Sequence, residues 1–206
     1  MSDHSRTRQG YAQLYLLGAF ALRDSSGTDR TPKNKKAQAI LAMLALSPRG
    51  TRTRAWLRNK LWSNSDEHHA SSSLRQTLFE LKKAFGPYTT DFIEFDRQSV
   101  SLQLDRIWVD VRVLTDNPGG MPARGQVLNL DLEFLEGMDI NDEEFEDWLM
   151  MERAAWEARL DKLKEQDSFS EEKELKSKIS FRHRPRQIGI GLLPCITHGK
   201  NPDIHP

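Results

Sequence analysis

A stripe of apolar residues at helical spacing most constrains how this 206-residue chain can fold. The stripe consists of Leu74, Leu78, Leu81 and Phe85. Residues three and four positions apart lie on one face of an α-helix, so the spacing predicts a helix with one buried face. Gly86 and Pro87 follow directly, and this pair is typical of a helix end. We therefore predict a helix from about Ala70 to Phe85 whose opposite face is exposed to solvent.

Shorter patterns on both sides of this helix predict a small domain of class α+β. In chain order we expect a strand-like run at Gln13–Arg23 that is interrupted at Gly18, a short strand near Thr28–Pro32, helices at Lys33–Leu46 and Thr51–Trp62, the 70–85 helix, and strands at Phe92–Phe95 and Val100–Leu104. Thr53 is suited to cap the second helix, and Asp96–Ser99 to form the turn of the final hairpin. This order is typical of a winged helix-turn-helix with an N-terminal antiparallel sheet.

The charged residues are distributed unevenly, although the net charge is zero. Residues 1–88 carry 15 Lys and Arg against 6 Asp and Glu, whereas residues 89–206 carry 15 against 24. A basic half beside an acidic half predicts two modules with different partners, and a basic surface is typical of a nucleic-acid contact. The Gly- and Pro-rich segment 116–125 suits a linker, so we expect one domain at 13–114 and a second module at 125–166.

The acidic module is expected to be helical. Residues 131–157 hold eleven Asp and Glu and a single basic residue, Arg153. Asn141 and Glu144 have the spacing of a capping box, which predicts a helix that runs to about Gln166. Its apolar side consists of Phe145, Trp148, Leu149, Trp156, Leu160 and Leu163. For residues 167–206 we expect a charged linker or frayed helix end, followed by an unpaired apolar strand at Gln187–Cys195 that does not pack on the first domain.

The exposed face of the 70–85 helix carries side chains that are able to read DNA. Its members are Ser72, Arg75, Gln76, Phe79, Lys82 and Lys83. Arg pairs with guanine, Gln pairs with adenine, Phe packs on the thymine methyl group, and Lys suits phosphates. Arg52 and Arg54 near the start of the second helix, and Arg97 in the hairpin turn, complete the candidate DNA-contacting set. The alternative is an ordinary amphipathic helix with a basic surface, but an exposed Phe79 favours a contact.

Patterns for catalysis, cofactor binding and metal binding are missing from the sequence. Cys195 is the only cysteine, which excludes an intramolecular disulfide and a multi-cysteine zinc site. His68 and His69 are adjacent and would diverge on a helix, so we interpret them as polar loop residues. Gly189 and Gly191 lack the third glycine of a dinucleotide-binding loop. We therefore expect no enzymatic activity, no cofactor and no metal.

Membrane association is not expected, because the longest apolar run, Ala37–Leu46, is far shorter than a bilayer-spanning segment. Leu14–Leu22, which follows Arg6 and Arg8, has some features of a signal peptide. However, the run is short, and the cleavage-like Ala19-Phe20-Ala21 falls inside it with no polar region between. We therefore interpret the run as a strand and expect a cytoplasmic protein.

Spaced motifs in both halves of the chain form a specific set. In the basic half they are Leu16-Leu17-Gly18-x-Phe20-x-Leu22, Lys36-Ala37-x-Ala39-Ile40-Leu41-Ala42-x-Leu44-Ala45-Leu46-Ser47-Pro48-x-Gly50, Leu57-x-x-x-Leu61-Trp62, and Ala70-x-x-Ser73-Leu74-Arg75-Gln76-x-Leu78-x-x-Leu81-Lys82-Lys83-Ala84-Phe85-Gly86. These resemble the DNA-binding half of the SARP-type bacterial activators, an OmpR/PhoB-like winged helix. In the acidic half, Phe134-Leu135-Glu136-Gly137 and Glu144-Phe145-Glu146-Asp147-Trp148-Leu149-x-x-Glu152-Arg153 resemble the opening of the bacterial transcriptional activator domain (BTAD), a tetratricopeptide-like helical array.

This resemblance, which covers about residues 13–166, implies a transcriptional activator that binds bacterial promoter DNA with sequence specificity. It implies that the 70–85 helix enters the major groove, that the 92–104 hairpin lies near the minor groove, and that the loop Ser63–His69 faces RNA polymerase. Activator domains of this family continue for several more helices, so the chain resembles a truncated or frameshifted member, or a short paralogue. Homo-oligomerisation is left open. The alternative function is a protein–protein adaptor that interferes with full-length relatives.

Overall fold

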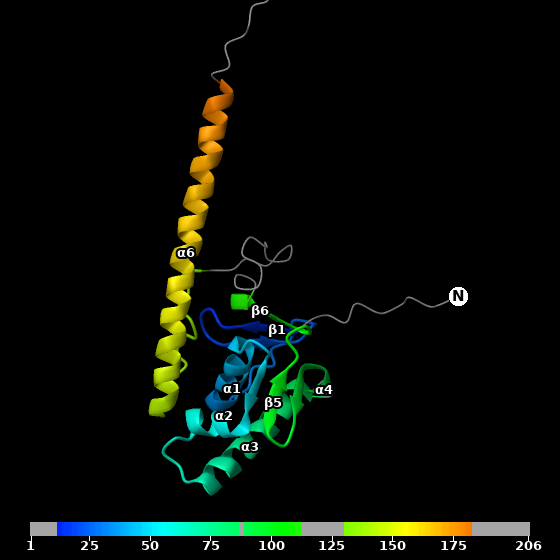
Figure 1. Ribbon diagram of the computed structural model, residues 1–206. Helices are drawn as coiled ribbons and strands as arrows, with labels where there is room; N and C mark the ends of the chain where they lie inside the picture. Colours follow the sequence, from blue (N-terminus) through cyan, green and yellow to red (C-terminus); the bar gives the residue numbers. More distant parts are fainter. Residues whose placement is uncertain (1–11, 87–88, 113–129, 183–206) are drawn as a thin grey trace, which may run out of the picture. The chain divides into compact units, whose positions relative to one another are not determined.

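The computed structural model describes residues 12–86, 89–112 and 130–182. The predicted linker 116–125 and the predicted strand Gln187–Cys195 lie outside the described residues, as do the side chains of Leu163 and of residues 166–182. The fold combines two three-stranded sheets with several helices, which is compatible with the expected class α+β (Figure 1). The described residues up to Lys164 belong to one compact unit. The division into domains at 13–114 and 125–166 stays a prediction.

The first sheet joins strands that lie far apart in the chain. Its middle strand is β1 (Ala12–Tyr15), which pairs antiparallel with β2 (Ala21–Arg23) and parallel with β6 (Ile107–Val109). The predicted strand-like run Gln13–Arg23 is thus divided into two strands, one on each side of the expected interruption at Gly18. The chain reverses between β1 and β2 near Gly18, whose positive φ of 77° suits a residue without a Cβ atom.

The segment after β2 forms a polar turn, and the second strand expected near Thr28–Pro32 is not among the described elements. Pairing in this described segment is limited to an isolated bridge between Arg23 and Asp29. Hydrogen bonds from local side chains compete with strand pairing in such segments. Here the competing group is the carboxylate of Asp24.

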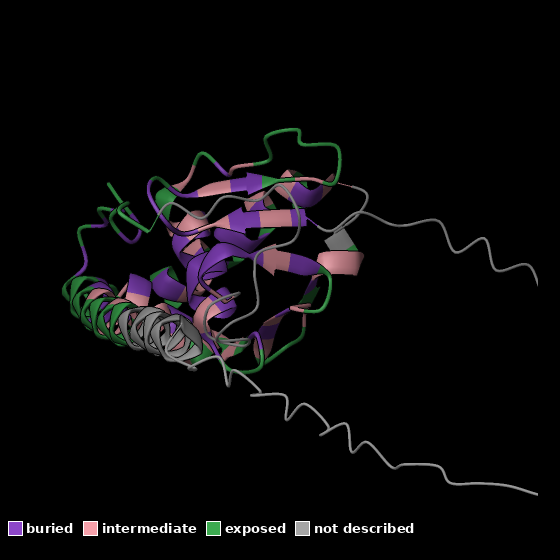
Figure 2. Ribbon diagram, turned by 90° about the horizontal axis from the view of Figure 1, so that it is seen from above, coloured by how far each residue is buried: buried purple, intermediate pink, exposed green. Residues whose placement is uncertain are grey.

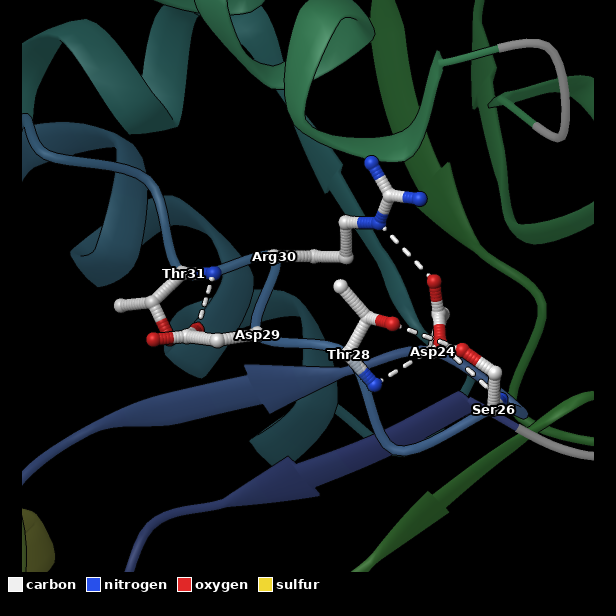
Figure 3. Close-up of polar contacts among 6 residues, drawn as sticks. All are labelled: Asp24, Ser26, Thr28, Asp29, Arg30 and Thr31. Atoms are coloured by element: carbon white, nitrogen blue, oxygen red, sulfur yellow. Dashed lines mark hydrogen bonds and ion pairs between the residues drawn. The ribbon is translucent and has the colours of Figure 1, made fainter.

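Asp24 organises this turn (Figure 3). Its carboxylate accepts hydrogen bonds from the backbone N–H of Ser26 at 2.9 Å, from the backbone N–H of Thr28 at 3.1 Å and from Arg30 Nε at 2.9 Å. The hydrogen bond from the Ser26 hydroxyl, followed by that from Arg30, lowers the pKa of Asp24 from 3.8 to about 2. The turn therefore favours the ionised carboxylate.

Three helices follow close to their predicted positions. They are α1 (Lys35–Leu46), α2 (Arg54–Leu61) and α3 (Glu67–Phe85), with N-caps Asn34, Thr53 and Asp66. The predicted cap at Thr53 is confirmed, because its hydroxyl accepts a hydrogen bond from the backbone N–H of Trp56 at 3.1 Å. α3 begins earlier than the predicted Ala70, since the Asp66 carboxylate accepts hydrogen bonds from the N–H groups of the first helical turn. It ends at Phe85, as predicted.

The second sheet is antiparallel and has the order β3–β5–β4. β4 (Ile93–Phe95) and β5 (Ser99–Leu102) form the predicted hairpin in slightly shortened form, because Phe92 ends a one-turn helix, α4 (Thr89–Phe92). β3 (Thr51–Thr53) was assigned to the second helix by the sequence pattern, and that part of the prediction is wrong. An N-cap residue has extended backbone, so Thr53 and the two residues before it are able to pair with β5.

Gly50 permits the close approach of β3 and β5. Its φ is +68°, and a Cβ atom at this position would lie 2.3 Å from the carbonyl oxygen of Leu102. The carbonyl oxygen of Gly50 accepts a hydrogen bond from the Leu102 N–H at 2.8 Å. Both the backbone conformation and the short separation therefore require glycine.

α1 lies at the centre of the hydrophobic core, and Figure 2 shows it buried along most of its length. Its buried residues are Ala37, Ala39, Ile40, Leu41, Ala42, Met43, Leu44 and Ala45. α3 adds the predicted stripe, since Leu74, Leu78, Leu81 and Phe85 are all buried. The predicted orientation of α3 is therefore confirmed.

Residues 133–136 attach the acidic segment to the first sheet. Backbone hydrogen bonds of 2.8–2.9 Å join them to residues 16–18, with donors on both sides. Arg153, which belongs to α6 (Glu143–Arg182), donates hydrogen bonds of 3.0 Å to the carbonyl oxygens of Phe134 and Leu135. The segment is therefore held by the sheet and by the first half of α6.

α6 buries most of its predicted apolar side, which comprises Phe145, Trp148, Leu149 and Trp156, with Leu160 partly buried. The predicted capping box is wrong, because the helix begins at Glu143 and the Glu144 carboxylate lies 2.5 Å from Lys60 Nζ. The predicted end near Gln166 is also wrong. The helix continues to Arg182, through residues for which a charged linker or a frayed helix end was expected.

A buried carboxylate ties the end of β6 to the end of β1. Asp110 is only 1% exposed, and its Oδ2 accepts hydrogen bonds from the backbone N–H groups of Leu16 and Leu17, both at 2.8 Å. Its Oδ1 accepts a hydrogen bond from the Val111 N–H at 2.8 Å. Burial raises the pKa of Asp110 above 3.8, and the backbone donors act in the opposite direction. Both side-chain oxygens are thus needed as acceptors.

We predict that Asp110→Asn lowers the free energy of unfolding by about 1–3 kcal/mol, because the new amide nitrogen would face a buried N–H donor. Urea-induced unfolding measures this change. The matched control is Asp105→Asn at an exposed position, which should stay within about 0.5 kcal/mol of the parent. Equal unfolding free energies for the two variants would contradict the role given to Asp110.

A second prediction concerns acid stability. Because the pKa of Asp24 is lower in the folded state, its ionised form stabilises the fold above pH 3.8, and this contribution is lost as the pH falls towards 2. Asp24→Asn keeps a carbonyl acceptor but loses the charge that pairs with Arg30. The Tm of the variant should therefore lie below that of the parent at pH 7, and the difference should shrink between pH 4 and pH 2.

The control for this experiment is Asp139→Asn, at an exposed position. Its Tm should follow that of the parent over the same pH range. A difference between Asp24→Asn and the parent that does not change with pH would show that the charge of Asp24 is not what stabilises the turn.

Candidate nucleic-acid interface

The outward face of α3 is exposed, as the helical spacing predicts. Its exposed residues are Ser72, Arg75, Gln76, Phe79, Lys82 and Lys83. Phe79 is 51% exposed, although large aromatic side chains are usually well buried. The acidic residues of α3 have partners on other elements, since Glu67 lies 2.6 Å from Arg58 and Glu80 accepts a hydrogen bond from Asn34 at 2.8 Å. This face therefore presents cations, an amide, a hydroxyl and a phenyl ring to solvent.

Aromatic rings position two of the lysines on this face. Lys83 Nζ lies 4.8 Å from the centre of the Phe79 ring, and Lys82 Nζ lies 4.9 Å from the centre of the Phe95 ring. An ammonium group is attracted to the face of an aromatic ring at such distances. The contact of Lys82 with Phe95 also brings the end of β4 against α3.

A small hollow of about 150 Å³ lies between α3, the start of α2 and the end of β4. It is lined by Arg54, Arg75, Leu78, Phe79, Lys82 and Phe95. The lining combines three apolar side chains with three cations. Three candidate residues of α3 therefore lie close to Arg54, which belongs to a different helix, α2.

Arg54 also joins the hairpin turn to this region. Its Nε donates a hydrogen bond to the carbonyl oxygen of Asp96 at 2.8 Å. Its backbone N–H donates a hydrogen bond to the carbonyl oxygen of Gln98, also at 2.8 Å. Arg97 lies between these two acceptors in the turn and is exposed. The structure therefore places Arg97 in the turn that Arg54 anchors beside the start of α2.

Arg52 lies in a different environment. Its guanidinium carbon lies 4.4 Å from the centre of the Trp56 ring, and its charge acts on Glu152 of α6. Burial raises the pKa of Glu152, while Arg159 and Arg52 lower it. The sequence grouped Arg52 with Arg54 because both were assigned to one helix. In fact Arg52 belongs to β3, whereas Arg54 is the first residue of α2, so the two residues lie on different elements.

A second, polar hollow of about 470 Å³ lies beside the first half of α3. It is lined by Asn34, Lys36, Trp62, Ser72, Ser73, Gln76 and Thr77. Lys36 Nζ lies 4.6 Å from the centre of the Trp62 ring and donates a hydrogen bond to the carbonyl oxygen of Leu61. Burial lowers the pKa of Lys36, and the nearby Asp142 carboxylate opposes this shift.

Sequence reasoning missed Lys36 as a functional candidate. An ammonium among hydroxyl and amide groups is suited to an anion such as a phosphate. The only sequence pattern that could have identified Lys36 was a charged residue at the start of the apolar run that forms α1. A single lysine at the start of a helix is common on any protein surface. Its closeness to Ser72 and Gln76 comes only from the packing of α1 against α3.

The turn between α2 and α3 is exposed and is tied to the acidic segment. The carboxylate of Asp142 accepts hydrogen bonds from the Ser63 backbone N–H at 2.9 Å and from the Ser63 hydroxyl at 2.8 Å. The prediction that His68 and His69 are loop residues is wrong, because both lie in the first turn of α3. His69 Nδ1 lies 2.6 Å from the carboxylate of Asp66.

No protein-family model matches this chain, and no curated protein sequence matches it. Within the described ranges, no three His, Cys, Asp or Glu side chains gather in a way that would hold a metal ion. The helices in the described part of the chain are too short or too polar to cross a membrane. The geometry of α3 and its neighbours is therefore the observation on which a functional proposal depends.

We predict that Asp142→Ala lowers the free energy of unfolding by about 1–3 kcal/mol, because two hydrogen bonds to a buried carboxylate are lost. Amide hydrogen exchange at Ser63 should also become faster. The control is Asp139→Ala, an exposed acidic residue of the same segment. Unchanged stability together with unchanged exchange would show that the α2–α3 turn is held without the acidic segment.

Proposed function

We propose that this protein is a sequence-specific regulator of transcription, and specifically an activator, that binds duplex DNA at bacterial promoters. In this proposal α1–α3 and the β4–β5 hairpin form a winged helix. α3 enters the major groove, which is wide enough for an α-helix. The hairpin turn with Arg97 lies beside the neighbouring minor groove. The proposal includes no catalytic step and no cofactor, and it assigns the protein to the cytoplasm.

The observation that carries this proposal is the composition of the exposed face of α3. Arg75 and Gln76 are consecutive in the sequence, so they project from opposite edges of this face, and both are exposed. They supply the bidentate partners of guanine and adenine. Lys82 and Lys83 lie further along the helix and suit phosphates, which position a protein without reading sequence. Base-reading and phosphate-binding groups thus share one rigid element.

The connection between α2 and α3 supports a second contact. Residues 63–69 are exposed, and Asp142 restrains the first of them through its two hydrogen bonds to Ser63. A restrained and exposed turn on the same helix pair as the DNA-reading face is suited to contact RNA polymerase beside the promoter. We include this contact in the proposal.

The test compares Arg75→Ala and Lys82→Ala, two variants on the exposed face that should leave folding intact. Arg75→Ala should weaken binding to a duplex selected by the protein by about 1–3 kcal/mol, with a smaller effect on random duplexes. Lys82→Ala should weaken binding to both duplexes similarly and reduce the salt slope by about one. Fluorescence anisotropy over a range of salt concentrations measures both effects.

The matched control is Lys162→Ala, which removes an exposed cation from α6. It should bind both duplexes as the parent does. If Arg75→Ala and Lys82→Ala also bind as the parent does, α3 is not the element that reads DNA.

A protein–protein adaptor is the second candidate, and one observation favours it. Met150 and Met151 on the acidic α6 are 65% and 70% exposed, and exposed apolar side chains are found at protein interfaces. An adaptor of this kind would interfere with full-length relatives or form a homo-oligomer. Selection from a random duplex library separates the two functions, because an adaptor would not select a duplex sequence.

A further inference from the structure

We propose that the hollow between α3, α2 and β4 receives the C5-methyl group of a thymine in the major groove. This inference rests on the proposed function, since it assigns a base preference to one part of the DNA-reading face. It concerns the hollow of about 150 Å³ that is lined by Arg54, Arg75, Leu78, Phe79, Lys82 and Phe95.

The floor of the hollow is apolar and well supported. Leu78 is almost fully buried and belongs to the core stripe of α3, so it cannot move away without disturbing the core. Phe79 stands beside it and is half exposed, while Phe95 is partly buried at the end of β4. The hollow therefore has apolar walls from two different elements. It remains open to solvent beside the face of α3 that carries Arg75.

Part of the lining of the hollow is cationic, which indicates an anionic ligand. Arg54, Arg75 and Lys82 line it, and no acidic side chain does. A small apolar recess that is lined in part by cations fits an apolar group carried on a polyanion. Duplex DNA has this chemistry, because a base edge lies between two phosphate backbones.

Among the four base pairs, thymine alone presents a methyl group in the major groove. Cytosine and adenine present amino donors there, and the lining offers no carboxylate to accept them. Guanine presents acceptors, which the cations of the lining would bind without filling the apolar floor. The lining therefore favours thymine, and Phe79 is the residue that determines this preference.

The experiment begins with a random-sequence duplex library, from which the full-length protein selects its preferred sites. The selected duplex is then synthesised again with deoxyuridine in place of each thymidine in turn, which removes only the methyl group. At one position the replacement should weaken binding by about three- to tenfold, the value expected for burial of one methyl group. Replacing that T·A pair by C·G should also weaken binding, and 5-methylcytosine should restore part of the loss.

Phe79→Ala connects this effect to the hollow. The side chain is exposed, so the variant should keep the unfolding midpoint of the parent. It should bind the thymidine duplex more weakly than the parent, and it should no longer distinguish thymidine from deoxyuridine at the sensitive position. Met150→Ala removes a similarly exposed apolar side chain from α6 and should keep the full methyl effect.

The outcomes separate the two proposals. If a sequence is selected but deoxyuridine is tolerated everywhere, the methyl site is wrong and the proposed function stands. The methyl site is also wrong if Phe79→Ala retains the parent's preference for thymidine, because the methyl group is then bound elsewhere. If the library yields no preferred sequence, the proposed function fails, and the methyl site fails with it.

Discussion

The rest of the structure depends on one constraint, which is that α1 must be buried on every side. A helix with apolar residues all round must be covered by other elements. α3, β3 and β5 contact α1, and each contributes only one of its faces to the cover. Because α3 is amphipathic, turning its leucine stripe towards the core leaves a polar face outside. The exposed candidate interface therefore follows from how the central helix is buried.

Prediction of the fold from sequence succeeded where periodicity is sustained. The spacing of Leu74, Leu78 and Leu81 persists over several helical turns, so it identified both the helix and its buried face. β3 was missed because a three-residue strand has too little pattern to be separated from the helix that follows. The capping box failed because the helix begins at Glu143 and the Glu144 carboxylate pairs with Lys60, which lies far away in sequence.

The candidate site could be predicted only in part, for the same physical reason. Residues on one face of α3 share a helix, so their grouping follows from local geometry. Arg54 and Phe95 join that face through the packing of α2 and β4, and Lys36 does so through α1. No local pattern encodes those contacts. Arg52 lies over the Trp56 ring and its charge acts on Glu152, and its role as a DNA contact stays a prediction.

The parallel pairing of β1 with β6 also governs the order of events during synthesis on the ribosome. β1 emerges first and forms a hairpin with β2, but its other edge waits for a strand about 90 residues downstream. At about 5–20 residues per second, that wait lasts about 5–20 s. The backbone N–H and C=O groups of this edge stay unpaired in the interval, and such edges recruit strands of other chains. The nascent chain is therefore most prone to aggregation before residue 107 leaves the ribosome.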